Sequence, residues 1–234
     1  MTTGTLYGIG VGPGAPDLLT LRAAATLGKV DVILAAASPR NDYSTALETA
    51  RPHLNPHAEI VRLEFPMTHN AALLTTAWNV AADTTEAILR QGRSAAFITI
   101  GDPLVYSTFG YLSRTLQARW PDLPLEIISG ITSFQAAAAR TNTILCEGKE
   151  SLLILPGING GASLKQGLEF SDNTVILKAY KNFPAIREAL EQAHCLKNAT
   201  FASRVYLNDE MFTRDLSALP AVPPYLSLVL AKKE

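Results

Sequence analysis

The stretch TLYGIGVGPG, residues 5–14, joins an apolar run to a series of closely spaced glycines. The apolar side chains predict a buried strand over Thr5–Val11. The glycines at 8, 10, 12 and 14 lie at and just beyond the end of that strand, where parallel sheets bind ligands because helix starts and bare backbone amides converge. A tight strand-to-helix turn that binds nothing would need the same glycines for its backbone angles, so both interpretations are open.

Strand-like and helical patterns alternate through the first half of the chain. Helices are expected over residues 18–27, 44–50, 70–91 and 107–118, and strands over 30–36, 59–63 and 94–100. The long helix is the clearest, because its apolar residues recur at helical spacing and Gly92 follows as a left-handed end cap. This alternation predicts an α/β fold with a parallel sheet and crossover helices.

A turn-rich segment, Pro121-Asp122-Leu123-Pro124, marks the expected domain boundary. We expect an N-terminal α/β domain over residues 1–120 and a C-terminal α/β domain with a mixed sheet over 121–234. The second domain would begin with a strand at 125–129 and a helix at 132–140, then strands at 151–155 and 174–178 and a helix at 184–193. Its last strand-like segments, 200–205, 211–216 and 225–230, have no helix between them, which predicts an antiparallel finish.

Composition narrows the class of protein. The 234 residues are 47% hydrophobic and 18% charged, which is typical of a packed globular enzyme. The net charge is −1, from 20 basic and 21 acidic residues without a block of either sign, so nucleic acid is not an expected partner. No apolar stretch approaches the roughly 20 residues of a membrane-spanning helix, and residues 1–4 do not start a secretion signal, so we expect a cytoplasmic protein.

The metal-binding residue types do not form a recognisable site. Cys146 and Cys195 lack CxxC spacing, and both are expected to be small buried side chains. His53 and His57 have a helical ligand spacing, but the neighbouring prolines interrupt that helix. We therefore expect surface histidines and no metal site.

Two further turns place polar groups at strand ends. Gly101-Asp102-Pro103 follows a predicted strand and is followed by the hydroxyl residues 106–108, while Ser129-Gly130-Ile131-Thr132-Ser133 joins the next strand to a helix. Asp102 and Ser107 could simply cap turns, as these residue types often do. Alternatively, the three turns converge on one pocket, because the carboxyl ends of parallel strands share an edge. For Lys178, Tyr180 and Lys181, at the end of a later strand, a charged loop and a pocket role are both open.

These segments together resemble the tetrapyrrole methylases, also called the uroporphyrin-III C-methyltransferase or corrin methyltransferase family. The resemblance rests on residues 8–14 with Asp17-Leu18-Leu19-Thr20, then on 101–103 and 130–133, in the family's order and approximate spacing. It implies the tetrapyrrole methylase fold, with two α/β domains and a ligand cleft between them. It also implies S-adenosyl-L-methionine as methyl donor, a tetrapyrrole substrate and a homodimer.

Within this family, three longer segments resemble the branch that methylates C(20) of precorrin-2 or cobalt-factor II in cobalamin biosynthesis. They are residues 65–68, 101–109 and 131–139. The resemblance places contacts to the methyl donor on Pro13, Gly101, Asp102, Val105, Thr132, Ser133 and Pro156, with a looser match near Val205. Two positions depart from the family pattern, since Ala15 replaces a frequent aspartate and Ser129 a frequent proline.

Methyl transfer from a sulfonium is an in-line displacement, so the protein must mainly position the acceptor carbon behind the methyl group and exclude water. Asp102 is the candidate catalytic residue, accepting the proton released from C(20). It could equally hold the methyl donor and leave proton removal to solvent. The sequence does not distinguish metal-free precorrin-2 from cobalt-factor II.

Three other functions compete with this interpretation. A ribosomal RNA methyltransferase of the same fold would be expected to show a basic face for phosphates. A nucleotide-dependent oxidoreductase would need a complete GxGxxG pattern, but Pro13 replaces its last glycine, and Ser38-Pro39-Arg40 stands where a ribose-binding acid is expected. A non-catalytic binding protein would leave the polar groups of three strand ends without a task.

Overall fold

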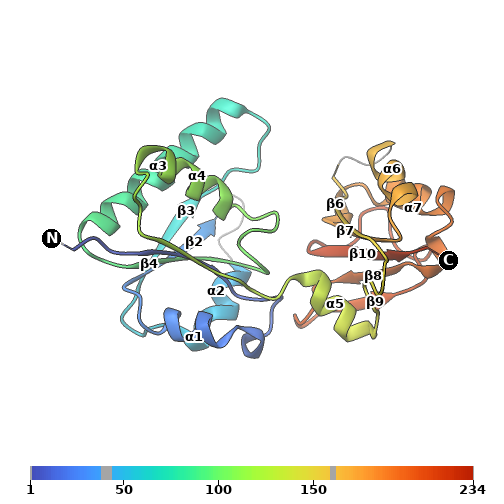
Figure 1. Ribbon diagram of the computed structural model, residues 1–234, viewed down its shortest axis with the longest axis horizontal. Helices are drawn as coiled ribbons and strands as arrows, with labels where there is room; N and C mark the ends of the chain where they lie inside the picture. Colours follow the sequence, from blue (N-terminus) through green and yellow to red (C-terminus); the bar gives the residue numbers. More distant parts are fainter. Residues whose placement is uncertain (1, 38–43, 159–161, 234) are drawn as a thin grey trace. The chain divides into compact units, whose positions relative to one another are not determined.

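The computed structural model describes residues 2–37, 44–158 and 162–233. Ser38-Pro39-Arg40, used above against a nucleotide site, therefore lies outside the described residues. The chain forms two compact units, Met1–Thr132 and Ser133–Glu234 (Figure 1). Within the described ranges, no helix is long and apolar enough to cross a membrane.

The first unit is a parallel five-stranded sheet in the order β3-β2-β4-β1-β5. Its strands are β1 (Leu6–Gly10), β2 (Val32–Ala37), β3 (Glu59–Glu64), β4 (Ala95–Thr99) and β5 (Leu125–Ile128). Its helices are α1 (Leu21–Leu27), α2 (Thr45–Ala50), α3 (Ala71–Arg90) and α4 (Phe109–Arg119), with 3₁₀ turns at Pro16–Leu18 and Arg51–His53. The α/β prediction is confirmed.

Helices cover both faces of this sheet because neighbouring strand residues point to opposite sides. Leu34 and Phe97 belong to the core under α3 and α4, whereas Ile33 and Ile98 belong to the core under α1 and α2. Figure 1 shows these two helix pairs on opposite sides of the sheet. Both faces are therefore apolar, which explains the nearly continuous apolar runs of the strands.

The long helix α3 agrees closely with its prediction. The side chain of Asn70 caps its start by accepting hydrogen bonds from the backbone N–H groups of Ala72 and Leu73, at 3.0 and 3.2 Å. Gly92 follows its end with a φ of +82°, the left-handed conformation expected there.

The strand at residues 125–128 belongs to the first unit. From the sequence it was expected in the second domain, because it follows the turn at residues 121–124. β5 pairs in parallel with β1, with Leu6 opposite Leu125. The chain therefore passes from the first unit to the second after Thr132, beyond the boundary expected at residue 120. The turn at Pro121-Asp122 connects α4 to β5 inside the first unit, and local turn chemistry alone does not reveal which sheet the next strand will join.

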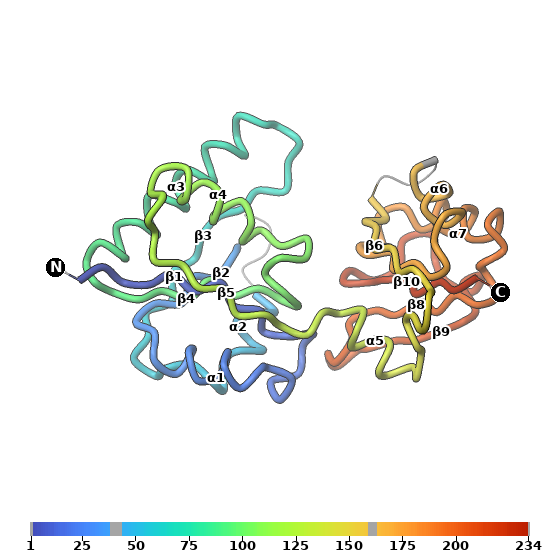
Figure 2. Tube along the Cα trace, viewed as in Figure 1, coloured from blue at the N-terminus to red at the C-terminus, as the bar shows by residue number. Residues whose placement is uncertain are grey.

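The second unit has a mixed five-stranded sheet in the order β6-β7-β10-β8-β9, in which β6 and β7 are parallel and the other pairs antiparallel. Its strands are β6 (Leu152–Pro156), β7 (Asn173–Leu177), β8 (Thr200–Ser203), β9 (Met211–Thr213) and β10 (Ser227–Lys232). Its helices are α5 (Ser133–Thr141), α6 (Ala162–Phe170) and α7 (Phe183–Gln192), with 3₁₀ turns at Ala179–Lys181 and Leu196–Asn198. The antiparallel finish is confirmed, and the last strand lies between β7 and β8 (Figure 2).

Helix α6 was missed by the sequence prediction. Its apolar pattern is short, because the buried residues Leu164 and Leu168 span only one turn of helix. Glycines also precede the helix, and Gly167 lies within it, which weakens the sequence pattern of a helix. A Cβ on Gly167 would lie 2.5 Å from a methyl carbon of Leu155, so this glycine lets the helix approach β6 closely. The helix therefore depends on packing against the sheet more than on its intrinsic propensity.

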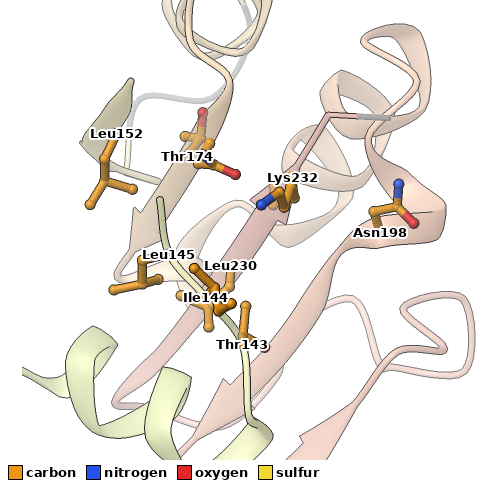
Figure 3. A pocket seen from close by; sticks show the side chains of 10 residues that line it. Thr143, Ile144, Leu145, Leu152, Thr174, Asn198, Leu230 and Lys232 are labelled. Carbon is orange, nitrogen blue, oxygen red and sulfur yellow. The ribbon is translucent and has the colours of Figure 1, made fainter. Parts of the chain in front are cut away.

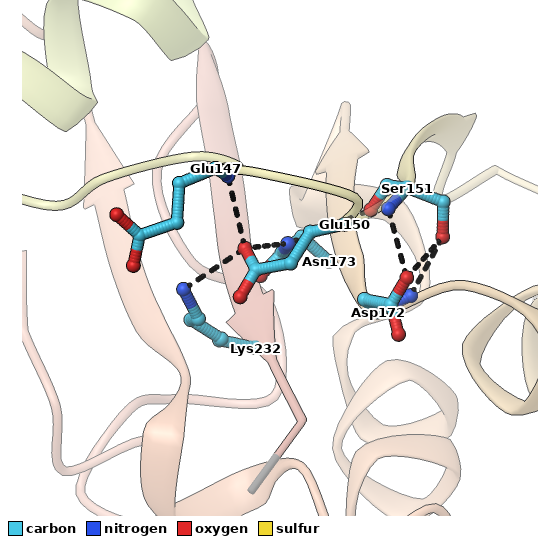
Figure 4. Close-up of polar contacts among 6 residues, drawn as sticks. All are labelled: Glu147, Glu150, Ser151, Asp172, Asn173 and Lys232. Atoms are coloured by element: carbon cyan, nitrogen blue, oxygen red, sulfur yellow. Dashed lines mark hydrogen bonds and ion pairs between the residues drawn. The ribbon is translucent and has the colours of Figure 1, made fainter.

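Two carboxylates form hydrogen bonds at one end of the second sheet (Figure 4). At this end β6 and β7 begin and β10 ends. Asp172 accepts hydrogen bonds from the backbone N–H and the hydroxyl of Ser151, at 2.8 and 2.7 Å. Glu150 accepts from the Asn173 amide at 2.9 Å and from the Lys232 ammonium at 3.2 Å. The Asn173 bond and then the Lys232 bond lower the pKa of Glu150 below its ordinary value. These carboxylates have structural partners at the end of the sheet where β6 and β7 begin.

Candidate functional site

Three loops meet at the carboxyl edge of the first sheet, after β1, β4 and β5. The loops after β1 and β4 are joined directly, since the Gly101 N–H donates to the Gly12 carbonyl at 2.7 Å and the Gly12 N–H donates to the Gly101 carbonyl at 3.3 Å. Both glycines are left-handed, with φ of +77° at Gly12 and +73° at Gly101. Other residues rarely adopt this conformation, which gives a physical reason for glycine at both positions.

Gly10 and Gly130 bring the backbones of these loops into close contact. A Cβ on Gly130 would lie 2.1 Å from the Gly101 carbonyl oxygen and 2.7 Å from the Gly10 carbonyl carbon. A Cβ on Gly10 would lie 2.4 Å from the same Gly101 oxygen. The three loops can therefore approach one another this closely only because Gly10 and Gly130 have no side chain. The regular spacing of glycines after the first strand was the sequence signal, but it did not show which glycine makes the contact.

Asp102 links the loop after β4 to the loop after β5. Its Oδ1 accepts a hydrogen bond from the Leu104 N–H at 2.8 Å, and its Oδ2 accepts one from the Gly130 N–H at 3.0 Å. Each carboxylate oxygen thus has a backbone donor, and charge-assisted bonds of this kind are stronger than neutral ones. This arrangement positions both loops, and any proton-accepting role would have to use the remaining lone pairs.

Ser107, one of the hydroxyl residues of the same loop, caps the turn that leads into α4. Its hydroxyl donates to the Thr99 hydroxyl at 3.1 Å and accepts from the Phe109 N–H at 3.1 Å, directly at the start of α4. The capping interpretation considered for Ser107 is therefore what the structure contains. Tyr106, immediately before it, has a left-handed φ of +50°, which is unusual for a bulky residue.

The predicted donor contacts divide between the two units. Pro13, Gly101, Asp102, Val105 and Thr132 belong to the loops of the first unit, and there the structure brings the three loops together. Ser133 is the first residue of α5 and Pro156 the last of β6, both in the second unit. The loosely matched Val205 follows β8 in that unit and is 4% exposed.

Gly101 leaves room for a ligand on the side from which its missing side chain would project. Among the described residues, a Cβ there would meet nothing nearer than the Thr132 Cα at 4.0 Å. The crowded contacts at Gly10 and Gly130 contrast with this open position. A ligand could therefore approach the Gly101 backbone without displacing protein atoms.

Two hollows elsewhere contain none of the predicted site residues. A cavity of about 20 Å³ in the second unit lies where residues 143–145 cover Leu230 of β10, and it has room for about one water molecule (Figure 3). A hollow of about 350 Å³ in the first unit is lined by Tyr7, Arg22, Lys29 and Glu126, among others. It lies at the amino end of the sheet, opposite the three loops, so neither hollow is the expected ligand site.

Histidine, cysteine, aspartate and glutamate are the side chains that most often hold metal ions in proteins. In the part of the chain that the structure describes, no group of three or more His, Cys, Asp or Glu is placed to hold a metal ion. His53 contacts the Pro16 carbonyl oxygen through Nε2 at 2.9 Å. Cys195 is buried as expected, but Cys146 is exposed because it lies in the irregular segment between α5 and β6, so that prediction was wrong.

Comparison with known proteins gives consistent relationships along the chain. The sequence model of a family described as Tetrapyrrole (Corrin/Porphyrin) Methylases matches residues 5–219. A cobalt-precorrin-2 C(20)-methyltransferase of Salmonella typhimurium is 35% identical over 99% of this chain and 97% of the relative. A precorrin-2 C(20)-methyltransferase of a Sinorhizobium species is 31% identical over 97% of this chain and 94% of the relative.

A solved structure shares the fold. Uroporphyrin-III C-methyltransferase from Thermus thermophilus, in complex with S-adenyl homocysteine, has a TM-score of 0.67 and 19% sequence identity, with 97% of each chain covered. At this identity the similarity establishes the arrangement of strands and helices and nothing finer.

Proposed function

Since this chain belongs to the tetrapyrrole (corrin/porphyrin) methylase family, we propose that it methylates C(20) of precorrin-2 or cobalt-factor II in cobalamin biosynthesis. The observation that carries this proposal is the full-length similarity to proteins named for C(20) methylation, at 35% and 31% identity. One of these names specifies a cobalt-precorrin and the other does not, so both substrates stay within the proposal.

S-adenosyl-L-methionine is the methyl donor of these methyltransferases, and when bound it supplies an electrophilic methyl group on a sulfonium. We propose contacts to it from Pro13, Gly101, Asp102, Val105 and Thr132 in the first unit. The open position at Gly101 and the joined loops around it support this assignment. Ser133 and Pro156 of the second unit stay predicted contacts.

The protein's main contribution would be positioning. A reduced tetrapyrrole carbon is already nucleophilic, so catalysis needs this carbon held in line behind the methyl group and water kept away. We propose that Asp102 supports this by fixing the loops after β4 and β5 through its two backbone hydrogen bonds. Acceptance of the C(20) proton by the same carboxylate stays a prediction.

The proposed activity is tested by offering each substrate with S-adenosyl-L-methionine and measuring the product mass. A gain of one methyl group on precorrin-2, on cobalt-factor II or on both is expected, with one S-adenosyl-homocysteine formed per methyl transferred. If the protein binds S-adenosyl-L-methionine but adds no methyl group to either substrate, the C(20) assignment is wrong.

We also propose a homodimer in the cytoplasm that uses no nucleic-acid partner. For the dimer, the family resemblance is supported by Leu73 and Val80 of α3, which are 56% and 58% exposed and seven residues apart, hence on one face of the helix. Light scattering should then give twice the chain mass of 25.1 kDa. The near-neutral net charge of −1 supports the expectation that nucleic acid is not bound.

A further inference from the structure

Unusual backbone conformations gather at one edge of the second sheet. Lys178, Arg204 and Leu226 have left-handed φ values of +57°, +51° and +62°. Lys178 follows β7, Arg204 follows β8 and Leu226 precedes β10, and β10 runs antiparallel to both other strands. All three residues therefore lie at the same edge, hereafter the Lys178 edge. Non-glycine residues pay a conformational cost in this region, and such costs are concentrated at functional sites.

Two buried hydroxyls at the Lys178 edge provide an independent observation. Ser203 of β8 and Ser227 of β10 are cross-strand partners and are 0% and 3% exposed. Neither hydroxyl has a hydrogen-bond partner among the described residues. Lys178 is close along the sheet, because Leu177 pairs with Leu228, the residue after Ser227. Buried polar groups normally find partners, so two buried hydroxyls without a partner among the described residues are an unusual feature of this edge.

Two tyrosines add hydrogen-bond donors beside Lys178. The rings of Tyr180 and Tyr225 pack edge to face, with centroids 5.1 Å apart and an interplanar angle of 79°. Burial, and then the neighbouring Tyr225, raise the pKa of Tyr180, so its phenol stays protonated and can donate. Burial, and then the neighbouring positive charge of Lys181, lower the pKa of Lys178 below its ordinary value.

Basic residues gather at the Lys178 edge. They are Lys178, Lys181 and Arg204, and Arg204 forms an ion pair with Asp209. Pro156, a predicted contact of the methyl donor, is the register partner of Leu177, the residue before Lys178. The Lys178 edge is therefore next to a position already expected to bind ligand, and its ammonium is suited to a carboxylate.

We propose that the Lys178 ammonium binds a peripheral carboxylate of the tetrapyrrole substrate, with the Tyr180 and Tyr225 hydroxyls as neighbouring donors. This inference rests on the proposed function, because uroporphyrin-type tetrapyrroles carry acetate and propionate side chains. S-adenosyl-L-methionine also carries a carboxylate, so the chemistry recognised is shared and the experiment must identify which ligand supplies it.

The test compares Lys178→Asn with Lys178→Arg in the full-length enzyme. Asparagine removes the charge but tolerates a left-handed backbone, whereas arginine keeps the charge. Lys197→Gln, at an exposed lysine of the same unit, is the matched control. For Lys178→Asn we expect the KM for the tetrapyrrole to rise roughly tenfold to a hundredfold, the range for losing a hydrogen bond to a charged group. The kcat and the Kd of S-adenosyl-L-methionine should change by less than about twofold, and Lys178→Arg should recover most of the affinity.

Each contrary result overturns the assignment in a recognisable way. A raised Kd for S-adenosyl-L-methionine would mean that Lys178 binds the donor, and a lowered kcat with unchanged KM would mean a role in the chemical step. If Lys178→Asn and the control Lys197→Gln have the same KM for the tetrapyrrole, Lys178 takes no part in binding it. If Lys178→Asn does not fold, the wild-type enzyme is assayed with a tetrapyrrole whose carboxylates are methyl esters. The KM for this ester must then rise as expected for Lys178→Asn. A wild-type enzyme that methylates no tetrapyrrole would instead refute the proposed function.

Discussion

Replacing Gly130 by alanine is expected to abolish methyl transfer and binding of S-adenosyl-L-methionine. The new Cβ would lie 2.1 Å from the Gly101 carbonyl oxygen and 2.7 Å from the Gly10 carbonyl carbon, and backbone atoms cannot move aside as a flexible side chain can. The loops after β1, β4 and β5 would have to separate. We expect the free energy of unfolding to fall by about 2–4 kcal/mol, as for severe overpacking. Isothermal titration with S-adenosyl-homocysteine and thermal unfolding measure the two effects.

Gly28→Ala is the matched control for this substitution. Gly28 ends α1 in the same unit with a right-handed φ of −70°, and a Cβ there would meet nothing closer than 3.6 Å. Alanine should therefore be neutral or slightly stabilising at this position. A Gly130→Ala enzyme with the ligand affinity and stability of the Gly28→Ala enzyme would contradict the close meeting of the three loops.

Asp102→Asn is expected to weaken binding of S-adenosyl-L-methionine at least about tenfold, because a charged hydrogen bond is lost. Whichever way the amide is turned, its NH₂ group must face either the Leu104 N–H or the Gly130 N–H, where a carboxylate oxygen now accepts. The free energy of unfolding should fall by roughly 1–3 kcal/mol. Titration of the ligand, together with single-turnover rates at saturating ligand, separates binding from chemistry.

The two proposed roles of Asp102 give different patterns. If it positions the loops, affinity falls while the bound fraction still turns over at a rate close to that of the wild-type enzyme. If it accepts the C(20) proton, single-turnover rates fall at saturation, and this result would contradict a purely positioning role. Asp122→Asn, at an exposed aspartate of the turn before β5, should change neither quantity.

Much of the first unit could be predicted because its signals are local and repeated. The strand over residues 5–11, the capped helix over 70–91 and the glycine turn are each determined within a short window of sequence. The strand at 125–128 was assigned to the wrong half because strand pairing is a long-range property: Leu125 is opposite Leu6, far away in the chain. Helix α6 was missed because its short pattern gains stability from contact with β6.

The candidate site shows the same division. Residue types at strand ends predicted which loops converge, and the structure joins Gly12 with Gly101 and Asp102 with Gly130. The pattern could not reveal that both Asp102 oxygens are engaged by backbone donors, because this depends on the distance between two loops. Likewise, a strand pattern does not reveal the left-handed backbone of Lys178, or that the Ser227 hydroxyl has no partner in the described part of the chain.

The most direct test of the proposed activity is to locate the transferred methyl group. The enzyme is incubated with S-adenosyl-L-methionine carrying a ¹³C-labelled methyl group and with precorrin-2 or cobalt-factor II, and the product is analysed by NMR. A single labelled methyl group bonded to C(20) is the predicted result. Labelling at any other carbon, or an unlabelled tetrapyrrole recovered beside enzyme that binds the methyl donor, would contradict C(20) methylation by this chain.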